Sequence, residues 1–166
     1  MELARRYLHV FGPTTAVSFG GWAGIGGAAA GATFRALSSQ LLPVETPIGP
    51  AWILEQDEAA ARAHPTRPNG VRLLPSGDAY FLAWGRDREL LVEDATRRAM
   101  LWTARVWPGA LLLDGDIAGT WRRSGTSLAV QSWTPLSPAA RDTVAAEAEL
   151  LPLPSRGRRP TVRFVD

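Results

Sequence analysis

Arginine is the residue type in this sequence best suited to bind an anionic ligand, and it supplies all 18 basic residues of the 166-residue chain. Its planar guanidinium donates paired hydrogen bonds to phosphate oxygens. Arg122 and Arg123 lie within the stretch DGDIAGTWRRSGTSLAVQSW (114–133), which predicts two strands joined by a turn at Ser124 and Gly125. At the tip of such a hairpin the pair is either ordinary solvated charge or a means of holding a polyanion.

The remaining arginines form further basic groups along the chain. Two lie on one face of the first predicted helix, one near the end of the third, and three in the segment SRGRRP. Each alone is expected to be a solvated surface residue, whereas together they suit a surface that contacts DNA phosphates. The expected DNA-binding residues are Arg5, Arg6, Arg35, Arg122, Arg123, Arg156, Arg158 and Arg159.

The sequence lacks the residue sets of most catalytic and metal centres. It has no cysteine, which excludes disulfides, thiolate nucleophiles and cysteine-based zinc sites. The two histidines, His9 and His64, have no partner at ligand spacing, and Asp114 and Asp116 around Gly115 are typical of a turn. We expect no metal, no cofactor and no self-sufficient catalytic constellation.

A glycine-rich segment, GGAAAGAT (26–33), has the spacing of a phosphate loop, but Ala32 stands where that loop needs lysine. Gly24, Gly26 and Ala29 also fit a dinucleotide-binding fingerprint, yet the preceding SFGGWA does not resemble a strand. The better interpretation is that small residues let two helices pack closely.

Residues 10–34 carry no charge and follow Arg5 and Arg6, as the core of an export signal follows its basic start. Glycine occupies seven of these positions and Pro13 interrupts them, so the segment has too few strongly apolar residues to span a membrane. We therefore expect a cytoplasmic protein with no membrane partner.

The first 60 residues predict three helices and a hairpin. A helix over 2–11 ends at Gly12-Pro13, a second begins near Ala16 after a cap at Thr14 or Thr15, and a third covers 28–37. The apolar stripe of the first helix consists of Leu3, Tyr7, Val10 and Phe11. Strands at 41–45 and 51–56 complete the pattern of a winged helix-turn-helix.

The sequence HPTRPNG marks a boundary, which predicts a winged-helix domain at 1–64 and a second domain at 65–166. Apolar runs predict strands at 71–75, 79–85, 90–92, 109–115, 116–123, 126–133 and 161–165, while 96–102 is ambiguous. Ser137 and Pro138 begin a helix over 136–151. The fold class is α+β, with a small antiparallel sheet or barrel closed by that C-terminal helix. Trp121 shares its parity with Ile117, so both are expected in the core.

Four stretches resemble, in order, the winged-helix DNA glycosylase family of AlkZ and YcaQ. They are ARRYLHVFGPTTAVSFGGWAGI, VRLLPSGDAYFLAWGRDRELL, PGALLLDGDIAGTWRR and SPAARDTVAAEAELL. The resemblance implies tandem winged helices with a small β-barrel, binding to duplex DNA, and excision of alkylated or crosslinked bases. On its motifs fall Asp78, Arg86, Asp87, Arg88, Gly115, Gly119, Trp121 and Arg122.

In that family, catalysis is assigned to a Gln-apolar-Gln or Gln-apolar-Asp motif near the N-terminus. Here none of Gln40, Gln56 and Gln131 has Gln or Asp two positions later. The chain therefore resembles the C-terminal half of such a protein, as a fragment or as a short paralogue, and its enzymatic activity is left open.

Three functions are compatible with these observations. The favoured one is a module that binds double-stranded DNA through its arginines. The second is a glycosylase acting on alkylated or crosslinked bases, which rests on the resemblance alone. The third is an interaction module that packs on a missing N-terminal half or a partner subunit through part of residues 10–34.

Overall fold

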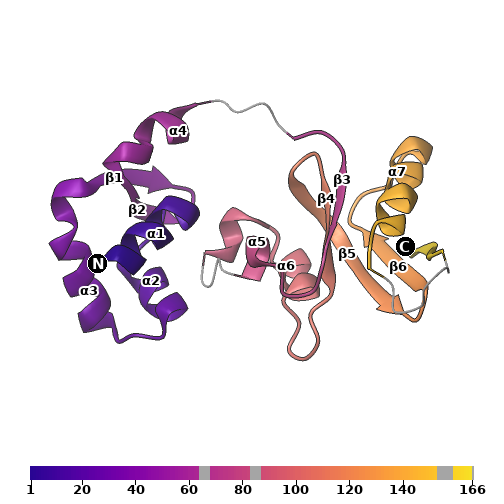
Figure 1. Cartoon of the computed structure of the whole chain (residues 1–166), viewed down its shortest axis with the longest axis horizontal. Coiled ribbons are helices and arrows are strands. Elements are labelled where there is room, and N and C mark those ends of the chain that lie inside the picture. The colour runs from indigo at the N-terminus through magenta and orange to yellow at the C-terminus, as the bar shows by residue number, and fades with distance from the viewer. Residues whose placement is uncertain (64–67, 83–86, 153–158, 166) are drawn as a thin grey trace. The chain divides into compact units, whose positions relative to one another are not determined.

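The computed structural model describes residues 1–63, 68–82, 87–152 and 159–165, and the chain divides into two compact units (Figure 1). The first unit contains Met1–Pro65 with Ala79–Leu90, and the second contains Thr66–Asp78 with Leu91–Asp166. Predictions that concern His64, Arg86, Arg156 and Arg158 lie outside the described residues.

Three helices open the first unit: α1 (Glu2–Phe11), α2 (Ala16–Ala23) and α3 (Gly27–Ala36). The predicted stripe of α1 was wrong in part, because Leu3 and Val10 are 54% and 65% exposed while Tyr7 is 3% exposed. The buried stripe is Ala4, Tyr7 and Leu8, with Phe11 packed beside it. Small Ala4 thus occupies the inward position that the prediction gave to Leu3.

Thr15 caps α2, since its hydroxyl accepts a hydrogen bond from the Ser18 backbone N–H. The helix ends at Gly24, whose φ of 67° is left-handed and favours glycine. A Cβ on Gly20 would lie 3.1 Å from the Cβ of Ala30, so glycine there lets α2 and α3 approach closely. The predicted role of small residues in helix packing is therefore realised at this pair.

A short hairpin follows the helices. After η1 (Ser38–Gln40), β1 (Leu41–Thr46) and β2 (Gly49–Leu54) pair in antiparallel fashion, and η2 (Glu55–Asp57) and α4 (Glu58–Arg62) come next. Its inner end joins the core of the unit through Leu41 and Leu54. That core consists of Ala4, Tyr7, Leu8, Phe19, Ala30, Phe34, Leu37, Leu41 and Leu54.

Two predicted strands are absent from the described part of 79–92. α5 (Ala79–Leu82) is a single helical turn with Phe81 buried, and η3 (Arg88–Leu90) covers the start of the second run. The predictions of strands at 79–85 and 90–92 were wrong over these residues. Short apolar runs do not distinguish a strand from a helical turn by periodicity, which explains the error.

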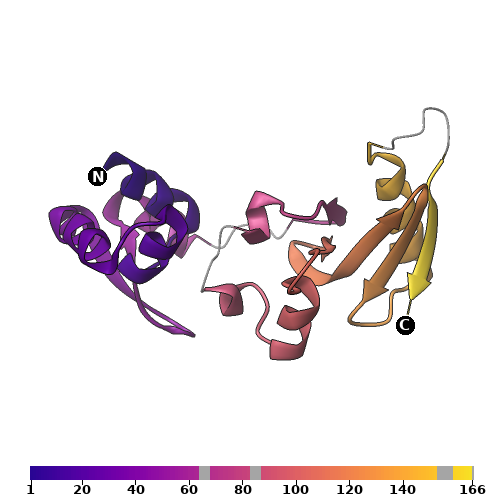
Figure 2. The ribbon, with the colours of Figure 1, turned by 90° about the horizontal axis from the view of Figure 1, so that it is seen from below.

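The second unit is built on one sheet in the order β3-β4-β5-β6-β7 (Figure 2). The strands are β3 (Val71–Leu74), β4 (Gly109–Leu113), β5 (Asp116–Ser124), β6 (Ser127–Ser132) and β7 (Thr161–Val165). The first four pair in antiparallel fashion, whereas β7 is parallel to β6. The sheet is therefore mixed rather than antiparallel, and within the described residues it is not closed into a barrel.

The parallel pairing follows from the helix between the last two strands. α7 (Pro138–Glu149) connects β6 to β7, and a strand–helix–strand crossover brings the second strand back in the same direction. Ser137 caps α7 and Pro138 occupies its first turn, as expected. The ambiguous segment at 96–102 forms α6 (Ala95–Leu101), capped by Asp94.

α7 covers one face of the sheet with Val144 and Ala148, both 0% exposed. Beneath them lie apolar residues of four strands, namely Val71, Leu73, Leu111, Leu128, Val130, Val162 and Phe164. Among the described helices, none is long and apolar enough to cross a membrane.

Candidate nucleic-acid interface

β5 contains an irregularity that decides which of its residues share a face. Leu111 pairs with Gly119, whereas the next residue, Leu112, pairs with Ile117, so a bulge at Ala118 shifts the register. Ile117 and Trp121 therefore lie on opposite faces of the sheet, and the prediction that shared parity puts them in one core was wrong. Trp121 packs against the core under α7, while Ile117 is buried on the other face.

The contacts of Trp121 are typical of a residue that packs within a sheet, and not of one that stacks on DNA bases. Its indole Nε1–H donates a 2.9 Å hydrogen bond to the Leu74 carbonyl, and its ring lies over Gly109 on β4. Gly119 is equally constrained, because a Cβ there would overlap the Gln131 carbonyl oxygen. Both motif residues thus serve the packing of the sheet.

Arg122 and Arg123, adjacent in sequence, project from opposite faces. Arg122 pairs with Ala129 on the face away from α7, and its guanidinium donates to the Val106 carbonyl at 3.0 Å. Arg123 pairs with buried Leu128 on the α7 face, and its guanidinium donates to the Pro152 carbonyl at 3.1 Å. Both are exposed, and neither has an acidic partner among the described residues.

Both arginines nevertheless line one cleft at the edge of the sheet. β4 begins at Gly109 opposite Trp121, so the end of β5 has no β4 partner beyond that point. The resulting open cleft, which we call the β5 notch, has a volume of about 590 Å³. It is lined by Pro75, Ser76, Val106, Trp107, Gly109, Trp121, Arg122, Arg123, Leu151 and Pro152. Because the described lining has two guanidiniums and no carboxylate, it suits an anionic ligand.

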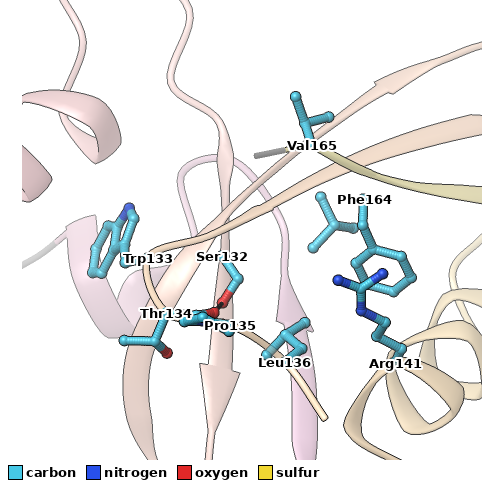
Figure 3. Close-up of a pocket in the computed structure, with 9 residues that line it drawn as sticks. Ser132, Trp133, Thr134, Pro135, Leu136, Arg141, Phe164 and Val165 are labelled. Carbon is cyan, nitrogen blue, oxygen red and sulfur yellow. Dashed lines mark hydrogen bonds between the residues drawn. The ribbon is translucent and has the colours of Figure 1, made fainter. Parts of the chain in front are cut away.

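A second hollow in the same unit is smaller, about 210 Å³ (Figure 3). The Arg141 guanidinium lies 4.9 Å from the centre of the Phe164 ring, which is within the range of a cation–π contact. The Ser132 hydroxyl donates to the Thr134 carbonyl at 2.7 Å, and Trp133 lies on the opposite side of the hollow from Arg141. Because Ser132 and Arg141 already contact other residues of the chain, this hollow is the weaker candidate site.

The arginines of the first unit differ in their availability. Arg5 and Arg6 both bind Glu2, at 2.7 and 2.9 Å, and Arg5 also donates to Gln40. These hydrogen bonds, from Arg6 and then Arg5, hold the pKa of Glu2 below its ordinary value. Arg35 is exposed on α3 and has no acidic partner in the described part of the chain.

A family model described as DNA glycosylase AlkZ-like matches residues 1–152. The chain belongs to the AlkZ-like DNA glycosylase family. The resemblance noted in the sequence is thereby confirmed. A solved structure, Streptomyces sahachiroi DNA glycosylase AlkZ, is similar to this AlkZ-like chain with a TM-score of 0.71 and 24% identity, a likeness of fold. The match covers 98% of this chain and 44% of that one, so the chain spans less than half its length. No curated protein sequence matches the chain.

The AlkZ-like motif residue Asp87 lies in a polar cluster of the first unit. Its carboxylate accepts hydrogen bonds from the hydroxyls of Ser18, at 2.9 Å, and Thr14, at 3.4 Å. Thr14 and Ser18 are 1% and 5% exposed, and the hydroxyl oxygens of Thr14 and Tyr7 lie 3.5 Å apart. Burial, more than the nearby Asp87 charge, raises the pKa of Tyr7. The cluster joins η3's segment to the start of α2.

Sequence reasoning missed the two hydroxyls of this cluster. The available signal was the pair of polar side chains at the start of an otherwise apolar helix, of which Thr14 was interpreted only as a possible cap and Ser18 was given no role. Of the other AlkZ-like motif residues, Asp78 donates its backbone N–H to the Pro75 carbonyl in a turn, and burial lowers the pKa of Arg88. Arg159 is exposed just before β7.

Proposed function

We propose that this AlkZ-like chain is a module that binds duplex DNA and contacts its phosphates through arginines. The observation that carries the proposal is the β5 notch, where exposed Arg122 lies beside an open cleft with no carboxylate among its described lining. A guanidinium that has no acidic partner and donates to one carbonyl retains most of its five N–H donors for phosphate oxygens. Membership of a family of DNA glycosylases favours DNA as the anionic ligand.

In this proposal the three helices and hairpin of the first unit act as a winged helix, with α3 as the helix that enters the groove. Its exposed residues include Ala28, Ala29 and Ala32, and the Thr33 hydroxyl is bonded to the Ala29 carbonyl. Such side chains have no donors for base edges. We therefore propose contact with the DNA backbone, with Arg35 as the charge that α3 contributes.

The other predicted arginines differ in how available their guanidiniums are to phosphate. Arg5 and Arg6 share the charge of Glu2, so part of their attraction for phosphate is already neutralised. Arg123 is held at the edge of the α7 face by Pro152. Arg156, Arg158 and Arg159 are proposed as contacts from their position in a basic segment. The domain boundary near residue 64 is likewise proposed, with residues 1–64 and 65–166 as the two domains.

The proposal is tested by fluorescence anisotropy with a labelled duplex over a range of salt concentrations. Binding through phosphates gives a linear decrease of log K with log salt concentration, with a slope of about −0.9 for each contact. Simultaneous Arg35→Ala and Arg122→Ala substitution is expected to reduce affinity for all duplexes alike and to flatten this slope by about 2. No detectable binding by the wild-type chain at low salt would contradict the proposal.

A second proposed function is excision of alkylated or crosslinked bases, completed by a separate segment or subunit. The family membership favours it, and the missing Gln-x-Gln or Gln-x-Asp motif is the reason a complement is invoked. Exposed Leu3, Val10, Val17 and Trp22 on α1 and α2 are proposed as its docking surface. Incubation of the chain, with and without that complement, with an N7-alkylated or crosslinked oligonucleotide tests this function. Absence of abasic-site cleavage in both samples would contradict it.

A further inference from the structure

The face of the sheet opposite α7 carries a largely polar set of residues on its last three strands. Paired residues of β5, β6 and β7 form three rows across this face. The rows are Thr120, Gln131 and Val165; Arg122, Ala129 and Arg163; and Ser124, Ser127 and Thr161. We call this set the open face.

The open face differs from its reverse in both burial and composition. The reverse side of the same strands places Trp121, Leu128, Val130, Val162 and Phe164 in the core under α7. On the open face only Thr120 is buried, and Arg122 and Arg163 are exposed. None of its nine residues is acidic and none is aromatic.

We propose that the open face binds the sugar–phosphate backbone of duplex DNA, with Arg163 as a contact residue together with Arg122. This inference rests on the proposed DNA-binding function and assigns it a second surface residue, located beyond the segment 1–152 that the family model matches. Because proteins bind unpaired bases chiefly by stacking them on aromatic side chains, a face without aromatics favours the backbone of a duplex over a single strand.

The spacing of the middle row supports a phosphate between two arginines. Neighbouring strands lie about 4.8 Å apart, so the Cα atoms of Arg122 and Arg163 are separated by roughly 10 Å. Ala129 between them is small, and a phosphate bound above it takes the place of the Val106 carbonyl as the acceptor for the Arg122 guanidinium. A phosphate over Ala129 is then flanked by two cations, with the hydroxyls of Ser127 and Thr161 in the next row as further donors.

The orientation of the strands provides a matched control. Arg123 is adjacent to Arg122 in sequence and carries the same charge, but it lies on the α7 face. If the open face is the contact, Arg163→Ala and Arg122→Ala each weaken duplex binding about 5- to 10-fold near 0.1 M salt and flatten the salt slope by about 1. Arg123→Ala, at the β5 notch but on the α7 face, is expected to flatten the slope less than either of these substitutions.

A charge inserted between the two arginines tests the same face without removing either of them. Ala129→Glu is expected to reduce duplex affinity by about tenfold or more, because its carboxylate competes with phosphate for both guanidiniums. Ala139→Glu, in the exposed first turn of α7, introduces the same charge where a carboxylate favours the helix. Circular dichroism of each variant shows whether the fold is retained.

The experiment is an anisotropy titration of the full chain and these variants with one labelled duplex and its separate single strand. Equal affinities and salt slopes for Arg163→Ala and wild type, or a folded Ala129→Glu variant that binds like Ala139→Glu, would overturn the open-face assignment while the DNA-binding function stands. Tighter binding of the single strand than of the duplex would overturn it as well. No binding by the wild-type chain would instead overturn the proposed function, and the open-face assignment with it.

Discussion

Trp121 lies across Gly109 on the neighbouring strand, and its indole N–H donates to the Leu74 carbonyl one strand further on. The side chain thereby spans the start of β4 and joins three strands at the edge where the β5 notch opens. The absence of a Cβ at residue 109 is what makes this possible, since a methyl group there would overlap the indole.

Gly109→Ala is therefore expected to destabilise the second unit by about 1–3 kcal/mol, because the tryptophan must leave its position or the strand must shift. Thermal unfolding monitored by near-ultraviolet circular dichroism measures the change. Gly21→Ala is the matched control, since a Cβ on Gly21 meets nothing within 4 Å and alanine favours a helix. Equal melting temperatures for Gly109→Ala and wild type would contradict the importance of this contact.

Ser18→Ala removes the shorter of the two hydroxyl hydrogen bonds to Asp87 and is expected to lower stability by about 1–2 kcal/mol. The loss follows from leaving a partly buried carboxylate oxygen without its donor. Ser39→Ala, at an exposed position of η1, makes the same chemical change without such a partner and should be nearly neutral. Denaturant unfolding of both variants checks this, and identical midpoints would show that the cluster contributes no stability.

Glu2→Gln tests whether Arg5 and Arg6 contact DNA. Removing the carboxylate that both guanidiniums bind makes them available to phosphate, and a gain in duplex affinity of about 2- to 5-fold is expected. Glu149→Gln, exposed at the end of α7, changes the net charge equally and serves as the control. An equal effect of the two substitutions on anisotropy titrations would exclude a specific contribution of Arg5 and Arg6.

The same interaction has a predictable dependence on pH. The pKa of Glu2 is lower in the folded chain than its ordinary value of 4.5, so the ion pairs contribute stability above that pH. This contribution is lost as the pH falls through the lowered folded-state pKa. Because the group is exposed, the effect is small and decreases with added salt. Unfolding midpoints of wild type and Glu2→Gln between pH 3 and 6 should converge at the acidic end, and a constant difference would contradict the assignment.

The composition of α3 predicts binding without base preference. Since Ala28, Ala29 and Ala32 supply no hydrogen-bonding groups, duplexes of unrelated sequence should bind within about threefold of one another. Competition titrations with an A·T-rich and a G·C-rich duplex of equal length check this. A preference of 100-fold or more would show that other side chains read the bases.

Local signals predicted much of the fold. The cap at Ser137, the glycine after α2 and the hairpin turns depend on a few neighbouring residues and were placed correctly, and the cap of α2 is Thr15, one of the two candidates. Apolar runs between turn residues also predicted the strands around Trp121. By contrast, the inward stripe of α1 was misassigned because small Ala4, rather than Leu3, faces the core.

The misassigned parts of the second unit depend on relations between distant segments. A bulge at Ala118 cannot be inferred from alternation, yet it moves Ile117 to the face opposite Trp121. The direction of β7 depends on the α7 crossover, which also brings Arg163 into one row with Arg122. The sequence prediction therefore included Arg122 but neither Arg163 nor the face on which the two residues lie.

The most direct measurement is the salt dependence of duplex binding by the wild-type chain and by the Arg35→Ala, Arg122→Ala double variant. We predict binding at low salt with a log–log slope of about −3 or steeper for wild type, and a slope flatter by about 2 for the variant. Undetectable wild-type binding, or a slope that the two substitutions do not change, would contradict DNA binding through these arginines.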